Sequence, residues 1–232
     1  MTTIDPAALL AALQLADSFF PTGAYAHSQG LEGMVRRDLV RDAAGVEEFI
    51  ANSLAWSIIP ADVVALLNAH RAVAAADLGT VIAIDHCLHV TKLASELRAA
   101  SRQAGRRLLT ETAAFVTDDR HARFRAAVMA GESPGHAAVA LGAIAAAQAI
   151  PAEVAALAFC HSYAVGVLGA SIRLLPVTHT QLQTTLRRLH PLIARELGRV
   201  RRRRWQDLRS FTPELDLVAI GHETEDLRQF AS

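Results

Sequence analysis

The stretch that decides the fold is residues 137–169, which read AAVALGAIAAAQAIPAEVAALAFCHSYAVGVLG. It is the most apolar part of the chain, although Gln148, Pro151, Glu153 and His161 interrupt it. A membrane-spanning helix needs about 20 predominantly apolar residues, and Pro151 and Glu153 divide this stretch near its middle. The stretch therefore predicts two buried helices, one on each side of Pro151, and no membrane span.

The composition of the whole chain also favours helices. Of the 232 residues, 52% are hydrophobic but only 5% are aromatic, and alanine is frequent throughout. Alanine is the residue that costs least in a helix, whereas strands favour β-branched and aromatic residues. We find no strand-like alternation, internal repeat or linker. We therefore expect an all-α fold, a single compact bundle of about ten helices over residues 1–232, with 211–232 as a C-terminal tail.

Charge and cysteine content limit the partners and the compartment. Lys+Arg and Asp+Glu number 23 each, and Lys92 is the only lysine. A neutral chain has no general attraction for nucleic acids or membranes. Cys87 and Cys160 form no disulfide framework and fit a reducing compartment. Residues 1–6 lack the basic segment of a signal peptide, so we expect a cytoplasmic protein.

Capping and breaking residues predict where the helices begin and end. Asp5 and Pro6 are typical of a helix start, and a break at residues 20–23 precedes a second helix, expected from Ala26 to Arg37. Asp42 predicts the cap of a third helix that ends at Pro60. Further helices are expected over about 61–76, 78–90 and 92–116, after Asp118, on both sides of Pro151, over about 178–204 and from Leu215 onward, with a loop at 131–135.

A group of residues between 85 and 89 raises the question of a metal site. His86 and His89 are three apart, so they share a helix face, and Cys87 lies between them. A closed zinc site needs about four ligands, however, and Asp85 points away from His89. The group is either a weak metal site or the polar edge of a partly buried helix.

No pattern for catalysis or nucleotide binding is found. Cys160 and His161 are adjacent, and neighbouring helical side chains diverge by about 100°, so they cannot form a nucleophile–base pair. Glycines occur in no phosphate-binding pattern. We therefore expect no enzymatic activity, no cofactor, no resident metal, and no GTP or ATP binding by the chain itself.

Two groups of arginines stand out. Arg201 to Arg204, followed by Trp205, could bind nucleic acid, but they also lie near a predicted helix end, where cations complement the helix dipole. Arg98, Arg102 and Arg106 are four apart and form a stripe on one helix face. The stripe either pairs with acids on neighbouring helices or meets an acidic partner, and the sequence leaves both open.

Four motifs follow one another in a characteristic order. They are LQLADSFFPTGAYAHSQGLE at 13–32, ELRAASRQAGRR at 96–107, SIRLLPV at 171–177, and a tail with DLVA at 216–219, HE at 222–223 and RQFAS at 228–232. The first contains Pro21, Gly23, His27, Ser28, Gly30 and Glu32. In order and spacing, from about residue 9 to the C-terminus, these motifs resemble the UreF family of urease accessory proteins.

The resemblance implies a function without catalysis. A UreF-like protein is a helical scaffold that dimerises and binds UreD (also called UreH). The complex recruits the GTPase UreG and assists GTP-dependent nickel insertion into apo-urease, with no cofactor of its own. The alternative is a helical metal-binding or nucleic-acid-binding module built on the histidines or arginines described above, but neither explains the motif at 13–32.

The resemblance also assigns partner-binding residues. Tyr163 corresponds to a tyrosine implicated in recruiting the GTPase, although Phe159 stands where some members have arginine. Arg173 occupies a basic position linked to fidelity of activation. His222, Glu223, Arg228 and Phe230 resemble the part that docks onto UreD. Independently of the resemblance, the spacing of Arg98, Arg102 and Arg106 makes the stripe a further candidate contact.

Each assignment has a purely local alternative. Tyr163 could be a core aromatic residue, and Arg173 could serve the dipole of its helix. His27 and Ser28 could brace a helix start, and Gly23 and Gly30 could serve backbone geometry. The chain departs from the family after Pro176, where Thr178, His179 and Leu182 replace the usual glycines and glutamine, and at Gln229, which replaces an apolar residue.

Overall fold

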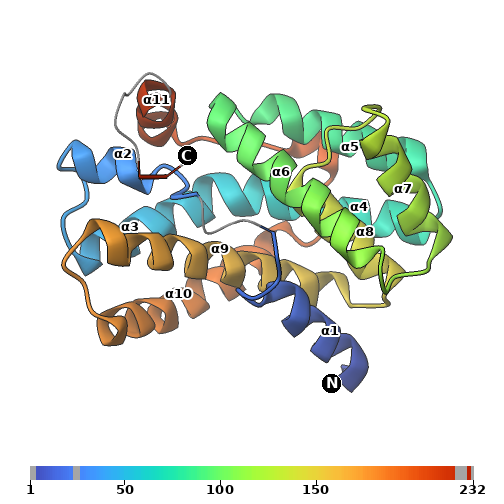
Figure 1. Cartoon of the computed structure of the whole chain (residues 1–232), viewed down its shortest axis with the longest axis horizontal. Helices are drawn as coiled ribbons and strands as arrows, with labels where there is room; N and C mark the ends of the chain where they lie inside the picture. Colours follow the sequence, from blue (N-terminus) through green and yellow to red (C-terminus); the bar gives the residue numbers. More distant parts are fainter. Residues whose placement is uncertain (1–3, 23–26, 223–228, 231–232) are drawn as a thin grey trace.

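The computed structural model describes residues 4–22, 27–222 and 229–230, without the side chain of His222. Within these ranges the regular elements are helices and no strand is present, which confirms the all-α class. They are α1 (Pro6–Ala16), α2 (Leu31–Arg36), α3 (Ala43–Ser53), the π-helix η2 (Leu54–Val63), α4 (Val64–Ala74), α5 (Leu78–Thr91), α6 (Ser95–Thr112), α7 (Asp119–Met129), α8 (Ala137–Ala147), α9 (Ala152–Leu174), α10 (His179–Val200), the 3₁₀ turn η3 (Trp205–Asp207) and α11 (Pro213–His222) (Figure 1).

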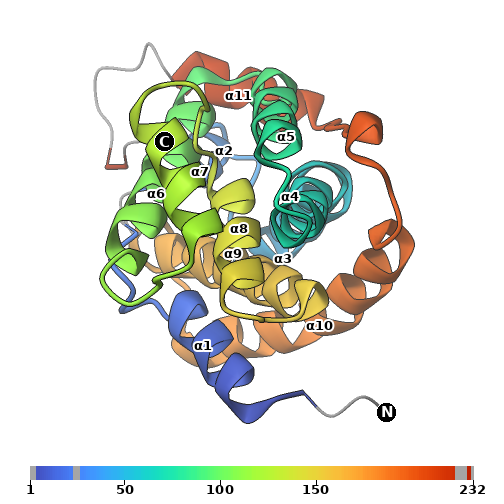
Figure 2. The same ribbon diagram turned by 90° about the vertical axis from the view of Figure 1, so that its right-hand side faces the viewer.

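The centre of the bundle is the contact between α4 and α8 (Figure 2). Nine of the eleven residues of α8, Ala138 to Ala146, are buried. Small side chains let the two helices approach closely, because a Cβ on Gly142 would lie only 2.5 Å from the carbonyl oxygen of Leu66. Two helices, α8 and α9, lie on the two sides of Pro151 as predicted. The predicted burial holds for α8, whereas only eight of the 23 residues of α9 are buried.

Side-chain caps start several helices where the sequence predicts them. Asp5 accepts a hydrogen bond from the Ala8 amide at 3.4 Å, and Asp42 accepts one from the Gly45 amide at 2.9 Å. Asp118 caps α7 in the same way. Such caps satisfy amides that have no partner within the helix.

The third helix does not end at Pro60, and this prediction was wrong. Proline has no N–H and cannot donate to the carbonyl four residues earlier, that of Trp56. The chain responds by widening into the π-helix η2, so that α3, η2 and α4 form one continuous helix over residues 43–74. The Trp56 carbonyl accepts a hydrogen bond from the Phe211 amide at 2.9 Å.

The second helix is shorter than predicted. It begins at Leu31 and not near Ala26, because Gln29 and Gly30 have positive φ angles of 57° and 87°. These left-handed conformations cannot continue into a right-handed helix. Gly23 lies outside the described residues, as do Glu223 and Arg228.

Two helices are long and apolar enough to cross a membrane by length and composition alone, Ala43–Ala74 and Ala152–Leu174. The most apolar window of the first is 67% buried within the bundle, and that of the second 44%. The first also contains Asp62, whose carboxylate is buried. The first therefore has the character of a core helix, whereas the second is buried along one side only.

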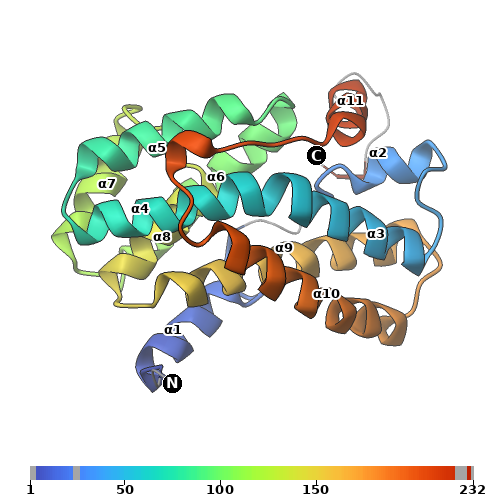
Figure 3. The same cartoon turned by 180° about the vertical axis from the view of Figure 1, so that it is seen from behind.

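The C-terminal segment returns across the bundle after α10. Residues 205–212 cross the face that Figure 3 shows, and α11 then packs against α2. Two backbone hydrogen bonds fix the crossing: Arg209 donates to the Pro60 carbonyl, and Phe211 donates to the Trp56 carbonyl. The proline that widens η2 thus provides the contact for a segment about 150 residues further along the chain.

Candidate functional site

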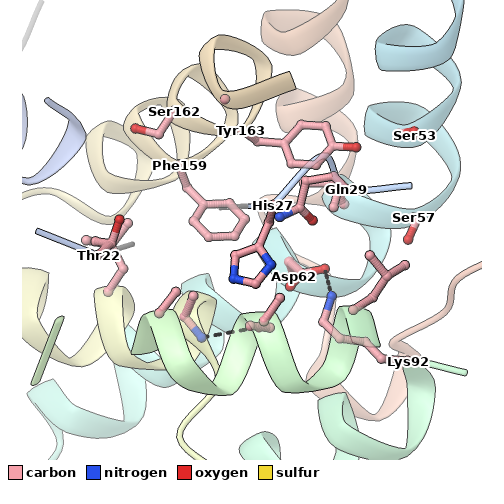
Figure 4. A pocket seen from close by; sticks show the side chains of 18 of the residues that line it. Thr22, His27, Gln29, Ser53, Ser57, Asp62, Lys92, Phe159, Ser162 and Tyr163 are labelled. Atoms are coloured by element: carbon pink, nitrogen blue, oxygen red, sulfur yellow. Dashed lines mark hydrogen bonds and ion pairs between the residues drawn. The ribbon is translucent and has the colours of Figure 1, made fainter. Parts of the chain in front are cut away.

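A cavity of about 220 Å³ lies between α1, η2, α6, α9 and residues 210–216 (Figure 4). Much of its wall is apolar and includes Leu97, Leu108, Leu141, Phe159 and Val165. One part of the wall is polar and includes His27, Asp62, Lys92 and Tyr163. The cavity therefore brings together residues of the motif at 13–32, Lys92, and Tyr163, the tyrosine to which the family resemblance assigns a partner-binding role.

A buried ion pair forms part of the polar wall. Lys92 Nζ lies 2.8 Å from a carboxylate oxygen of Asp62, and the two side chains are 14% and 3% exposed. A buried charge is tolerated when its partner and geometry compensate the lost hydration. The pair fixes the end of α5 to η2. The sequence offered one signal for it, a single lysine in a chain whose other basic residues are arginines.

Tyr163 and Phe159 turn toward this cavity from α9 (Figure 4). Burial raises the pKa of the Tyr163 phenol, with the Ser53 side chain acting in the opposite direction. The local alternative, a partly buried aromatic residue packed against the core, describes the position of Tyr163 here. Its role in recruiting the GTPase stays a prediction.

His27 reaches the cavity just before α2 (Figure 4). Burial, followed by the nearby charge of Arg107, lowers the pKa of its imidazole, and Glu96 acts against them. Ser28 is buried, and its hydroxyl accepts a hydrogen bond from the Glu32 amide at 3.3 Å. The expectation that Ser28 braces a helix start agrees with this contact, whereas Pro21 is exposed.

The group at residues 85–89 does not gather around one point. The buried carboxylate of Asp85 accepts hydrogen bonds from the Ser133 hydroxyl and from the amides of Gly135 and His136. His86 bonds the Glu132 carbonyl, and Cys87 lies 3.9 Å from the Trp205 carbonyl. Across the ranges that the structure describes, no group of three or more His, Cys, Asp and Glu residues could hold a metal ion.

A serine–histidine pair emerges that sequence reasoning missed. Ser101 Oγ, on the cavity wall, lies 3.0 Å from His136 Nδ1, and His136 Nε2 lies 3.1 Å from His89 Nδ1. This series of three side chains resembles a nucleophile–base relay. Burial and the charges of Lys92 and Arg102, however, lower the pKa of His136 to about 2. A base that weak cannot accept the serine proton effectively at neutral pH.

Within the described residues, the guanidinium groups of the arginine stripe bond backbone carbonyls. Arg98 donates to the carbonyls of Lys92 and Leu93 at the end of α5. Arg102 donates to the Pro134 carbonyl, and Arg106 donates to the Val128 carbonyl. The three guanidinium groups thus hold α6 against backbone carbonyls of neighbouring segments. Their role in partner binding stays a prediction.

The basic run at 201–204 follows the last turn of α10. Side chains of α4 bond its carbonyls: Asn68 donates to Arg203, and Arg71 donates to Arg201. Arg201 also lies 3.8 Å from Glu153. These hydrogen bonds hold the end of α10 against α4. Whether the guanidinium groups serve the helix dipole or a partner stays a prediction.

The signature at 13–32 and the C-terminal segment meet at α2. Gly30 faces Leu215 and Gly33 faces Val218, both on α11. Glu32 is 1% exposed, and its carboxylate accepts hydrogen bonds from the amides of Gln229 and Phe230. The guanidinium of Arg173 lies 3.9 Å from the centre of the Phe230 ring. Sequence patterns gave no sign of this meeting, because the two segments lie at opposite ends of the chain.

Comparison with known proteins places these features in a family. The UreF family model matches residues 40–190. Urease accessory protein UreF of Paenarthrobacter aurescens (strain TC1) is 32% identical over 227 residues, covering 96% of this chain and 97% of the relative. UreF 1 of Brucella melitensis biotype 1 is 31% identical, covering 96% and 92%. UreF of Trichodesmium erythraeum (strain IMS101) is 30% identical over the whole of both chains. The chain belongs to the UreF family of urease accessory proteins.

Proposed function

We propose that this chain is a cytoplasmic, non-enzymatic scaffold for urease maturation. It binds UreD (UreH) and the GTPase UreG, and the complex assists GTP-dependent delivery of nickel, as cargo, to apo-urease. Membership of the UreF family supports the urease connection. The named relatives are accessory proteins, and the low pKa of His136 argues against the Ser101–His136 pair as a catalytic device.

The observation that carries the proposal is an exposed apolar surface on the C-terminal segment, which we call the tail face. It consists of Phe211, Leu217 and Ile220, together with Trp56 of η2 beside Phe211, and these side chains are 71%, 72%, 46% and 56% exposed. Large apolar side chains exposed along one segment are candidates for a protein interaction site. We assign the tail face to UreD.

A second exposed apolar surface supports self-association. Leu10 and Leu13 lie one turn apart on α1 and are 67% and 58% exposed, and Phe19, shortly after the helix, is 93% exposed. Covering such residues with a second copy removes apolar area from water at roughly 25 cal/mol per Å². We propose that α1 forms the homodimer contact. Light scattering tests it: Leu10→Asp with Leu13→Asp yields a monomer mass, and a dimer mass in this variant contradicts the assignment.

The tail-face assignment is tested by co-purification with UreD and UreG. The full chain is compared with a chain lacking residues 211–232, with Leu217→Asp, and with Met129→Asp as a control. Met129 is also exposed, at 48%, but it lies on α7, away from α11 (Figure 1). We expect truncation and Leu217→Asp to lose UreD and Met129→Asp to retain it. Retention of UreD by the truncated chain contradicts the proposal.

The scaffold role also predicts how binding to the GTPase UreG depends on its nucleotide. A protein without catalytic groups can shift a partner between two states only by binding one of them more tightly. Binding of the UreD complex to UreG therefore differs between GDP, a GTP analogue and no nucleotide. Equal dissociation constants in the three conditions refute a role in gating the GTPase, and leave passive assembly as the function.

A further inference from the structure

The carboxylate of Glu32 is an unusually complete receptor for the end of the chain. One oxygen accepts the Gln229 amide at 2.9 Å and the other accepts the Phe230 amide at 3.0 Å. Arg36 Nη2 lies 2.9 Å from the first oxygen, and the Glu32 side chain is 1% exposed. Hydrogen bonds to an ionised carboxylate are stronger than those between neutral groups, so α2 holds two consecutive amides at one fixed point.

A second element grips the same pair of residues. Arg173 lies in the last turn of α9, with its guanidinium 3.9 Å from the centre of the Phe230 ring. Phe230 is only 4% exposed. A guanidinium stacked on an aromatic face attracts it electrostatically and also covers it. Backbone and side chain of the same dipeptide are therefore bound by two different helices.

These contacts fix one end of the C-terminal segment, and the Trp56 carbonyl fixes the other end through the Phe211 amide. Between the two points, α11 lies against α2, where Leu215 meets Gly30 and Val218 meets Gly33. A Cβ on Gly33 would lie 2.6 Å from the Val218 side chain. With this side of α11 packed, Leu217 and Ile220 remain exposed.

We propose that Glu32 and Arg173 form a clasp for residues 229–230, and that the clasp holds α11 in the orientation that presents the tail face to its partner. Glu32 and Arg173 are thus positioning residues for docking. A segment that is ordered before it binds loses less conformational entropy on binding, and its affinity is therefore higher. The docking half of this inference rests on the proposed function of the tail face; the clasp itself is a property of the isolated chain.

The clasp is tested first on the isolated protein, by hydrogen exchange of the α11 amides. Glu32→Gln keeps the shape but removes the charge, Arg173→Met removes the cation, and Phe230→Ala removes the ring. Controls are Glu47→Gln and Arg195→Met, which alter exposed ion pairs on α3 and α10. We expect exchange in α11 to accelerate at least about fivefold in the three clasp variants, with the buried amides of α4 and α8 unchanged. Unchanged exchange in α11 overturns the clasp.

A double-variant comparison shows whether Arg173 acts through Phe230. If it does, Arg173→Met has no further effect on α11 exchange once Phe230→Ala is present. Full additivity of the two changes means that Arg173 stabilises this region by other contacts, and it removes Arg173 from the clasp. Lysine at position 173 retains the cation, so Arg173→Lys is expected to recover part of the protection.

The docking half is tested by measuring the affinity of the same variants for UreD. We expect a dissociation constant raised by about threefold to tenfold for each clasp variant, comparable with the cost of ordering one or two side chains, and no change for the controls. Wild-type affinity in variants with accelerated α11 exchange overturns the positioning role. If a chain lacking 211–232 binds as tightly as the full chain, it is the proposed function of the tail face that fails, while the exchange result still decides the clasp.

Discussion

The α4–α8 contact and the α2–α11 contact are both close approaches at glycine, but they are held in different ways. At Gly142 a Cβ would strike the backbone of Leu66, whereas at Gly30 and Gly33 it would strike the side chains of Leu215 and Val218. The first contact is buried and apolar. The second is completed by the carboxylate of Glu32, which accepts hydrogen bonds from the amides of Gln229 and Phe230 near the other end of the chain. We infer that the core resists change as one unit, and that the C-terminal segment can open locally.

The largest effect is expected where the core loses volume. Phe124, on α7, is fully buried in the core cluster. Phe124→Ala removes a large apolar side chain and leaves a cavity, so we expect the free energy of unfolding to fall by about 3–5 kcal/mol. Denaturant unfolding followed by circular dichroism measures it. A loss below about 1 kcal/mol would mean that the core repacks freely, and the contrast with the C-terminal segment would not hold.

A smaller effect is expected at Lys92, where the core meets the C-terminal segment. Lys92→Met leaves the carboxylate of Asp62 buried without its cation. We therefore expect the free energy of unfolding to fall by about 3 kcal/mol. Asp62→Leu combined with Lys92→Met removes both charges and is expected to recover most of this loss. If the double variant is as unstable as Lys92→Met, the lost energy comes from packing of the lysine side chain and not from an unpaired charge.

The sequence predicts the core well because its signals are local. Periodic apolar residues, Pro151 between α8 and α9, and the caps Asp5, Asp42 and Asp118 each act within a few residues. Pro60 shows the limit of such reasoning. Its missing N–H normally ends a helix, but here a segment from the far end of the chain supplies the Trp56 carbonyl with a donor, and a local rule cannot foresee that donor.

The site is harder to predict because its parts come from distant segments. Asp62 and Lys92 pair across η2 and the end of α5, and Ser101 and His136 meet across α6 and the turn before α8. The sequence left open whether the arginine stripe pairs with acids of neighbouring helices or meets an acidic partner. Its hydrogen bonds to backbone carbonyl oxygens depend on the fold and could not be read from the spacing. The resemblance to a family locates Arg173 and Glu32 as positions of interest, and only the structure connects both to Phe230.

The pH dependence of stability is expected to report on His136, next to the core. Its pKa is lowered from 6.5 to about 2 by burial, with added repulsion from Lys92, His89, Arg102 and Arg98. Below pH 6.5 this imidazole becomes protonated in the unfolded chain but stays neutral in the folded chain. The free energy of unfolding is therefore highest above pH 6.5 and falls as the pH drops below it. Between pH 8 and pH 5 this histidine alone is expected to lower the free energy of unfolding by about 2 kcal/mol.

The measurement compares unfolding of the wild-type protein with that of His136→Asn at both pH values. Other histidines with lowered pKa, such as His70 and His121, contribute equally to both proteins. The variant is therefore expected to lose about 2 kcal/mol less than the wild type between pH 8 and pH 5. The same loss in both proteins would show that His136 becomes protonated in the folded state.

The smallest effect on global stability is expected at Phe230, although it is almost as buried as Phe124, at 4% exposed. A segment that opens locally does not contribute its contacts to the global transition. Phe230→Ala should therefore lower the free energy of unfolding by less than about 1 kcal/mol, while trypsin cleaves the C-terminal segment faster in the native protein. A loss of about 3 kcal/mol without faster cleavage would show that the tail unfolds together with α4 and α8. In that case the α2–α11 contact is part of the core, and burial alone, with no regard to position in the chain, would set the cost of losing an aromatic ring.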